Sequence, residues 1–167
     1  MAYTITNAMV GWQPIADTST VQTKPLGTIV DAYDPTYGGG EFIYLKGVGS
    51  TAVGSWVGYS PALGTSVLAA ASGTYPLAVA MSACSTTTLF GWYQISGTAR
   101  ALGLTSITHS SGFLALSGTA GSLDDASIIG DHVFNARKTT AVHVVGTFLD
   151  TYQINRPFTP NVVTVRN

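Results

Sequence analysis

Three histidines are the side chains of this 167-residue chain best suited to bind a metal ion or to move a proton. His109, His132 and His143 are not spaced at i, i+2 or i, i+4, so no two of them are placed to hold one zinc ion. Cys84 is the only cysteine, which excludes a cysteine-based zinc site and an intramolecular disulfide. Its neighbours, A-M-S-A-C-S, indicate a small apolar core residue rather than a reactive thiol. We therefore expect neither a metal nor a cofactor.

The acidic and hydroxyl side chains also lack a catalytic arrangement. Asp124 and Asp125 in S-L-D-D-A could form a carboxylate pair, but neighbours on a strand point to opposite faces. A turn with Asx-type hydrogen bonds is the preferred interpretation of this dipeptide. A Ser-His-Asp triad of the hydrolase type would need a G-x-S-x-G nucleophile elbow, which the sequence does not contain. The chain is not expected to be an enzyme.

A glycine-rich stretch, Gly38-Gly39-Gly40, could cradle a phosphate group. Such a site needs a helix that begins after the glycines, whereas a segment rich in β-branched and aromatic residues follows here. Asp34-Pro35 begins a turn, because proline fixes φ and the aspartate can accept hydrogen bonds from the backbone ahead of it. We expect the three glycines to complete that turn.

Three tryptophans could serve as platforms on which sugars stack. Trp12, Trp56 and Trp92 lack the polar and charged surroundings that would bind sugar hydroxyls. Aromatic residues of a core or of a subunit interface are therefore the preferred interpretation.

The composition is unusual in its lack of charge. Hydrophobic residues make up 46% of the chain and charged residues 9%, against about 25% charged residues in an average soluble domain. Something other than charge must cover the surface, either a symmetric assembly or faces rich in serine and threonine. The net charge of −1 provides no basic patch for nucleic acid. No secretory signal and no apolar run long enough to cross a membrane are present, so we expect synthesis in a reducing cytosol.

The segment 41–48 is the best-defined strand of the sequence. Phe42 and Tyr44 share one face with Lys46, while Ile43 and Leu45 share the other with Glu41. A strand that is apolar on both faces is usually covered on both, in the middle of a sandwich or at a subunit interface. We expect Phe42, Tyr44, Trp56 and Trp92 in such a core or interface.

Short strands separated by turn signals follow one another along the rest of the chain, which predicts an all-β barrel or sandwich. Ser96-Gly97 is expected to be the turn of a hairpin between 90–95 and 98–102. No amphipathic helical window of useful length is present, so helix content should be small. The expected strands are 27–33, 41–48, 54–59, 65–71, 77–83, 90–95, 98–102, 113–116, 127–129, 132–136, 142–149, 152–154 and 162–165.

Residues 1–26 have scattered apolar residues without the regular spacing of the strands that follow, which predicts an extended arm. We expect a domain at 27–156 after the arm, and a tail at 157–167. Pro14 and Pro25 exclude a long helix, yet the segment is too apolar for a solvated tail. The arm should lie on a partner or, alternatively, pack on its own domain as an N-terminal strand. The residues expected to make its contacts are Tyr3, Ile5, Met9, Val10, Trp12 and Ile15.

The amino-acid sequence between residues 27 and 142 resembles the head-decoration, or cement, proteins of tailed bacteriophages. The resemblance is carried by G-T-I-V-D-A-Y-D-P-T-Y-G-G-G-E-F-I-Y-L-K-G-V-G-S-T-A-V-G-S-W-V-G-Y at 27–59, L-A-V-A-M-S-A at 77–83, G-W-Y-Q-I-S-G-T-A at 91–99, T-A-G-S-L-D-D-A at 119–126 and G-D-H-V-F-N-A at 130–136. It covers about two thirds of the chain and leaves out the first 26 residues and the end of the tail.

The resemblance implies a β-rich, non-enzymatic protein, often a homotrimer, that binds the major capsid protein on the outer surface of a phage head. Such a protein is made in the host cytoplasm and bridges neighbouring capsid subunits, here through the arm at 1–26. Two alternatives stay open at this point. One is another virion component, such as a head fibre base or a tail protein. The other is a glycan-binding β-sandwich for host attachment.

Overall fold

The protein is all-β, as predicted. A computed structural model describes residues 3–6, 11–104, 114–124, 131–139 and 149–160, and these contain twelve strands and no helix. No described segment is therefore a helix that could cross a membrane. The strands are β1 (Thr4–Ile5), β2 (Thr18–Ser19), β3 (Ile29–Asp34), β4 (Gly38–Lys46), β5 (Trp56–Tyr59), β6 (Ser66–Leu68), β7 (Leu77–Ala80), β8 (Phe90–Leu102), β9 (Leu114–Leu116), β10 (Leu123–Asp124), β11 (His132–Lys138) and β12 (Leu149–Phe158).

Strands β3 and β4 form a hairpin whose turn begins at Asp34. The Asp34 carboxylate accepts hydrogen bonds from the backbone N–H of Thr36 at 2.7 Å and of Tyr37 at 3.1 Å, which confirms the predicted turn. The three glycines do not belong to that turn, contrary to expectation, because all three pair with β3 as the first residues of β4. Gly40 tolerates no side chain there, since a Cβ atom would lie 2.8 Å from the carbonyl oxygen of Ser96 on β8.

Strand β4 is covered on both faces, as its sequence predicts. Phe42 and Tyr44 enter one hydrophobic cluster, and Ile43 and Leu45 enter another. Its neighbour β8 alternates in the same way, with Trp92 in the first cluster and Tyr93 in the second. The pair β4–β8 therefore separates two cores.

Strand β8 runs without interruption through Ser96 and Gly97, so the predicted hairpin is wrong. One edge of β8 pairs with β4 as far as Gly97, and the other edge pairs with β12 from Ser96 to Leu102. Residues 98–102 thus take their hydrogen bonds from a distant strand rather than from 90–95. At Gly97 φ is +100°, a conformation that bends the strand and that other residues rarely adopt.

Five strands close into a small barrel. Strand β4 pairs with β8, β8 with β7, β7 with β5 and β5 with β6. A parallel bridge between Thr65 and Lys46 then returns from β6 to β4, and the hydroxyl of Ser66 donates to the carbonyl of Lys46 at 2.7 Å. The barrel interior is filled by Ile43, Leu45, Val57, Ala78, Ala80, Cys84, Tyr93 and Ile95.

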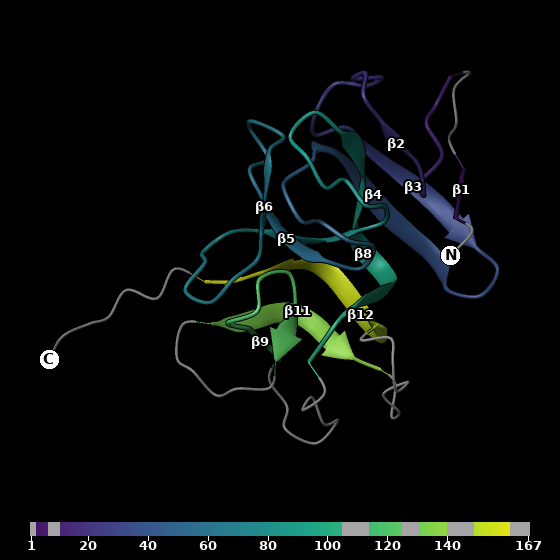
Figure 1. The fold of residues 1–167 in the computed structure, drawn as a ribbon. Helices are drawn as coiled ribbons and strands as arrows, with labels where there is room; N and C mark the ends of the chain where they lie inside the picture. The colour runs from purple at the N-terminus through teal and green to yellow at the C-terminus, as the bar shows by residue number, and fades with distance from the viewer. Residues whose placement is uncertain (1–2, 7–10, 105–113, 125–130, 140–148, 161–167) are drawn as a thin grey trace, which may run out of the picture.

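A second layer lies against the outer side of this barrel. The second half of β8 continues through β12 and β11 to β9 and β10, and in Figure 1 these yellow and green strands lie below β5. The core between this layer and β5–β7 is formed by Trp56, Ala69, Leu77, Val79, Ala99, Ala101, Leu114, Leu116, Leu123, Val133, Tyr152 and Ile154. The expected strands at 127–129 and 162–165, and almost all of 142–149, lie outside the described residues.

The bend in β8 should depend on Gly97. A Cβ atom at this position would lie 2.4 Å from the carbonyl oxygen of Gly39, in addition to the unfavourable φ. We expect Gly97→Ala to lower the free energy of unfolding by about 3 kcal/mol, measured by urea denaturation. Gly49→Ala is the matched control, since a Cβ atom there meets nothing within 4 Å. Equal effects of the two substitutions would show that the bend does not require glycine.

Candidate interaction surfaces

The N-terminal segment lies on its own domain. Tyr3 and Ile15 are only 8% and 2% exposed, in a cluster with Phe42, Tyr44 and Trp92. Two further residues expected in the arm, Ile5 and Trp12, are partly buried against the same cluster, whereas Met9 and Val10 lie outside the described residues. Of the four predicted contact residues that the structure describes, Ile5 and Trp12 are therefore the ones that keep exposed surface for a partner.

Hydrogen bonds from Gln13 hold this segment against β4 and β8. The indole N–H of Trp92 donates to the backbone carbonyl of Gln13 at 2.9 Å, and the hydroxyl of Tyr44 donates to its side-chain oxygen at 3.2 Å. The side-chain amide of Gln13 donates to the carbonyls of Asp17 and Phe90. A buried residue whose backbone carbonyl and side-chain amide together have these four partners favours one position of the segment over others. Gln13 was not among the residues predicted from the sequence, where its one available signal was its place within an otherwise apolar stretch.

Tyr3 provides a second anchor. Its hydroxyl donates to the carbonyl oxygen of Thr98 at 2.8 Å and lies beside the side-chain amide of Gln94. Burial raises the pKa of Tyr3 to about 12, because the phenolate would lose its hydration there.

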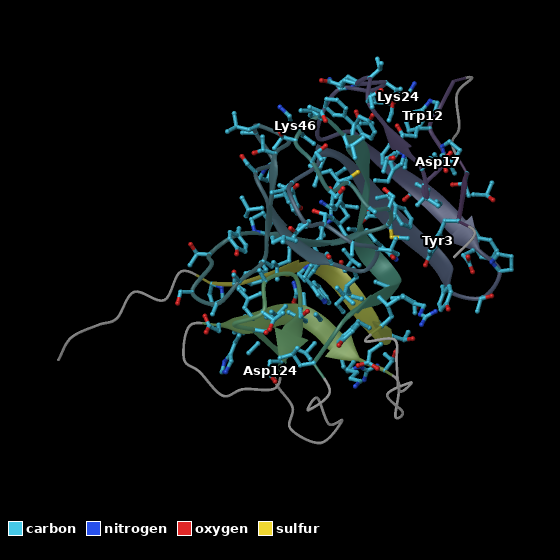
Figure 2. All side chains as sticks on the ribbon, viewed as in Figure 1. Tyr3, Trp12, Asp17, Lys24, Lys46 and Asp124 are labelled. Atoms are coloured by element: carbon cyan, nitrogen blue, oxygen red, sulfur yellow. The ribbon has the colours of Figure 1, made fainter. Side chains whose placement is uncertain are left out.

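Trp12 is the one tryptophan that reaches the surface. Its ring stacks on Trp92 with centroids 5.8 Å apart and planes 6° from parallel, and the Lys24 ammonium lies 4.8 Å from the ring centroid. Trp12 and Lys24 lie at the end of the molecule opposite Asp124 in the view of Figure 2. The indole N–H of Trp12 is buried without an acceptor in the described structure. A hollow of about 340 Å³ beside it is lined by Tyr3, Thr4, Ile5, Gly11, Trp12, Pro14 and Ile15.

The four aromatic residues expected in a core or subunit interface belong to the core of the single chain. Phe42, Tyr44, Trp56 and Trp92 are all 0% exposed. The indole N–H of Trp56 donates to the carbonyl of Leu102 at 3.1 Å. Trp56 and Trp92 are therefore closed to a sugar ring, which leaves Trp12 as the stacking platform available at the surface.

The candidate chemical residues do not come together in the described part of the chain. His109, His143 and Asp125 lie outside it, and no group of three or more His, Cys, Asp or Glu side chains forms within it. Asp124 lies in strand β10 and not in a turn as expected, opposite Ala115 of β9. Cys84 is buried in the barrel, and this burial raises the pKa of its thiol.

Large apolar side chains remain exposed elsewhere on the molecule. They lie on three separate strands, β3, β6 and β11, at the end of β12 and in three connecting segments. The exposed residues are Val21, Ile29, Tyr33, Val53, Leu63, Val67, Phe134 and Phe158, with 39–69% of their surface accessible.

Two shallow hollows meet where β8 bends. One, of about 360 Å³, lies along β3 and β4 beside Asp31 and Tyr33. The other, of about 480 Å³, lies along β11 and β12 beside Asn135 and Arg137. Ser96 lines both, so the two hollows adjoin.

A buried ion pair joins β11 to β12. Lys138 Nζ lies 2.8 Å from Asp150 Oδ2, and the two side chains are 5% and 1% exposed. Arg156 and Glu41 form a second pair at 3.1 Å, with side chains 56% and 33% exposed. Burial makes the first pair far more sensitive to the loss of one partner than the second.

Asp150→Ala should leave the Lys138 ammonium buried without its carboxylate. We expect the free energy of unfolding to fall by about 3–5 kcal/mol in urea denaturation. Glu41→Ala, which breaks the exposed pair, should change it by less than about 1 kcal/mol. Lys138→Met combined with Asp150→Leu should recover much of the loss, because neither charge is then buried at this site. Similar losses for Asp150→Ala and Glu41→Ala would contradict this account.

The raised pKa of Tyr3 predicts a loss of stability at high pH. Between the ordinary tyrosine value of about 10 and about 12, the folded state keeps a proton that the unfolded state has released, so stability falls as pH rises. Tyr3→Phe should be less stable than the wild type by about 1 kcal/mol at pH 7, since its hydrogen bond is lost. That difference should narrow above pH 10, as followed by urea unfolding at each pH. A constant difference in stability up to pH 12 would show that the pKa of Tyr3 is not raised in the folded state.

Comparisons of the chain with protein-family models, with curated proteins and with solved structures found no significant match. Its function is therefore to be inferred from its own residues and surfaces.

Proposed function

We propose that the protein is a non-enzymatic structural component of a phage virion. In this role it is a decoration, or cement, protein that binds the outer surface of the head and bridges major capsid subunits. The resemblance of residues 27–142 to such proteins motivates the proposal. The observation that carries it is the exposed apolar surface of a domain with very little charge.

That surface is best explained by a protein partner. Charged residues are 9% of the chain. Within the part of the chain that the structure describes, eight large apolar side chains remain 39–69% exposed although six large aromatic residues are fully buried. Scattered exposed apolar residues are normal, but a domain with this little charge relies on other means to stay soluble. A patch of about 800 Å² per partner forms a specific interface, and a shell repeats each such interface many times.

The outer side of the N-terminal segment is the proposed capsid contact. Ile5 and Trp12 keep exposed surface there, next to the hollow of about 340 Å³ and to Lys24. Gln13 and Tyr3 hold the segment in place through hydrogen bonds to residues of β4 and β8. A contact surface that is ordered before binding loses less conformational entropy on association.

The glycan-binding alternative is less well supported. Two of the three tryptophans that could stack on sugars, Trp56 and Trp92, are fully buried. Trp12 remains, but one face of its ring is stacked on Trp92. Another virion component, such as a fibre base or a tail protein, would share the same surface properties and is distinguished by its copy number.

The copy number of the protein in purified virions, relative to the major capsid protein, tests the proposed role. We expect a ratio near one, or a simple fraction repeated over the whole shell, by quantitative mass spectrometry. A handful of copies per particle would place the protein in a tail or fibre. Absence from virions would overturn the proposal.

The capsid contact is tested with Trp12→Ala and with capsids assembled without this protein. Loss of a central aromatic residue should weaken binding by at least about tenfold, as measured by co-sedimentation. Val53→Ala is the matched control, since Val53 is 43% exposed in the turn before β5. Thermal unfolding of both variants would show that the fold persists. Unchanged binding by Trp12→Ala would exclude this segment as the contact.

A further inference from the structure

Strand β3 presents an acidic and apolar face to solvent. Its residues alternate, with Val30 and Ala32 buried under the N-terminal segment, and Ile29, Asp31 and Tyr33 exposed. Ile29 is 44% and Tyr33 53% exposed. We call Ile29, Asp31 and Tyr33 the acidic face.

Strands β11 and β12 present a basic and aromatic face. Val133 points into the core and Ala136 packs against it, and the irregular register at Asn135 leaves Phe134 and Arg137 both exposed. Phe134 stacks on Phe158 of β12 with centroids 5.5 Å apart and planes at 22°. We call Phe134, Arg137 and Phe158 the basic face.

The acidic face and the basic face are alike in composition and opposite in charge. Each has two large exposed apolar side chains and one exposed charge. Among the described contacts, the Asp31 carboxylate has no cationic partner, and Arg137 donates to the neutral Gln153 side chain at 3.3 Å. By contrast, Glu41 and Arg156 already neutralise each other. Asp31 and Arg137 are thus a negative and a positive charge available for contact with another molecule.

The hollow beside Arg137 could receive an aromatic side chain. Its volume of about 480 Å³ lies along Asn135, Gln153 and Asn155, within the range of about 300–1,000 Å³ of pockets that bind small ligands. Tyr33 is the longest apolar side chain of the acidic face and is 53% exposed. With Tyr33 of one copy in this hollow, Asp31 would approach Arg137 of the other.

We propose that the partner of these faces is a second copy of this chain, with the acidic face of one copy on the basic face of the other. Charge complementarity is the reason for this choice of partner, because every copy has both the acidic face and the basic face. The inference adds a self-contact to the proposed capsid contact and rests on that structural role, in which copies lie side by side. If both contacts form within one pair, the assembly is a two-fold dimer. If they form head to tail, it is a ring where the rotation closes and an open filament where it does not.

The test measures the mass of the full chain in solution, without capsids, by analytical ultracentrifugation over a range of concentrations. The wild type should associate. Asp31→Arg and Arg137→Asp should each raise the dissociation constant at least about tenfold, because like charges then face each other. Mixing the two single variants, or combining both changes in one chain, should restore association, since opposite charges meet again. This rescue separates a direct contact from a general loss of folding.

Asp17→Arg is the matched control, because Asp17 is also exposed but lies outside both faces, before β2. A wild type that remains monomeric at all concentrations would overturn the proposal, as would association that persists in both single variants or a mixture that is not rescued. Capsid binding is measured separately with the Trp12 variant, so failure of the self-contact leaves the proposed capsid role intact, and the reverse also holds.

Discussion

The rest of the structure depends on the bend of β8 at Gly97. This strand pairs with β4 along one edge and with β2, β7 and then β12 along the other. Because β8 changes direction, one strand supplies residues to all three cores: Trp92 to the first, Tyr93 and Ile95 to the barrel, and Ala99 and Ala101 to the last. The close approach of the Gly39 carbonyl to Gly97 shows why a side chain is excluded at the bend. A straight β8 would leave β12 without its pairing to residues 96–102.

The division of residues between core and surface leaves large apolar side chains exposed. Large aromatic residues fill the interior, and few charges remain for the outside. Two of the charges that do exist, Lys138 and Asp150, are buried against each other. The surface is thus left with small polar residues and with exposed apolar side chains on several faces. Such a surface is stable when other proteins cover part of it.

Buried polar groups determine where the N-terminal segment lies. Apolar contacts alone would allow several positions of residues 11–17 on the sheet, since hydrophobic burial is not directional. Gln13 removes that freedom, because only one position lets its side-chain amide meet Tyr44 and the Phe90 carbonyl while its backbone carbonyl accepts from Trp92. The same network makes the outer side of the segment a rigid surface instead of a loose arm.

The sequence by itself determined the all-β class, the turn at Asp34 and the two-sided burial of β4. These follow from neighbours in the chain, because side chains alternate along a strand and an aspartate caps its own turn. The tertiary structure decided the features that depend on distant partners. The Ser96-Gly97 dipeptide suits a hairpin turn and a strand bend equally well. It forms a bend because β12 pairs with residues 96–102. The three glycines joined β4 for the same reason, since β3 lies alongside them. Whether the N-terminal segment covers its own domain was likewise set by Tyr44 and Trp92, which lie far from Gln13 in the chain but next to it in the fold.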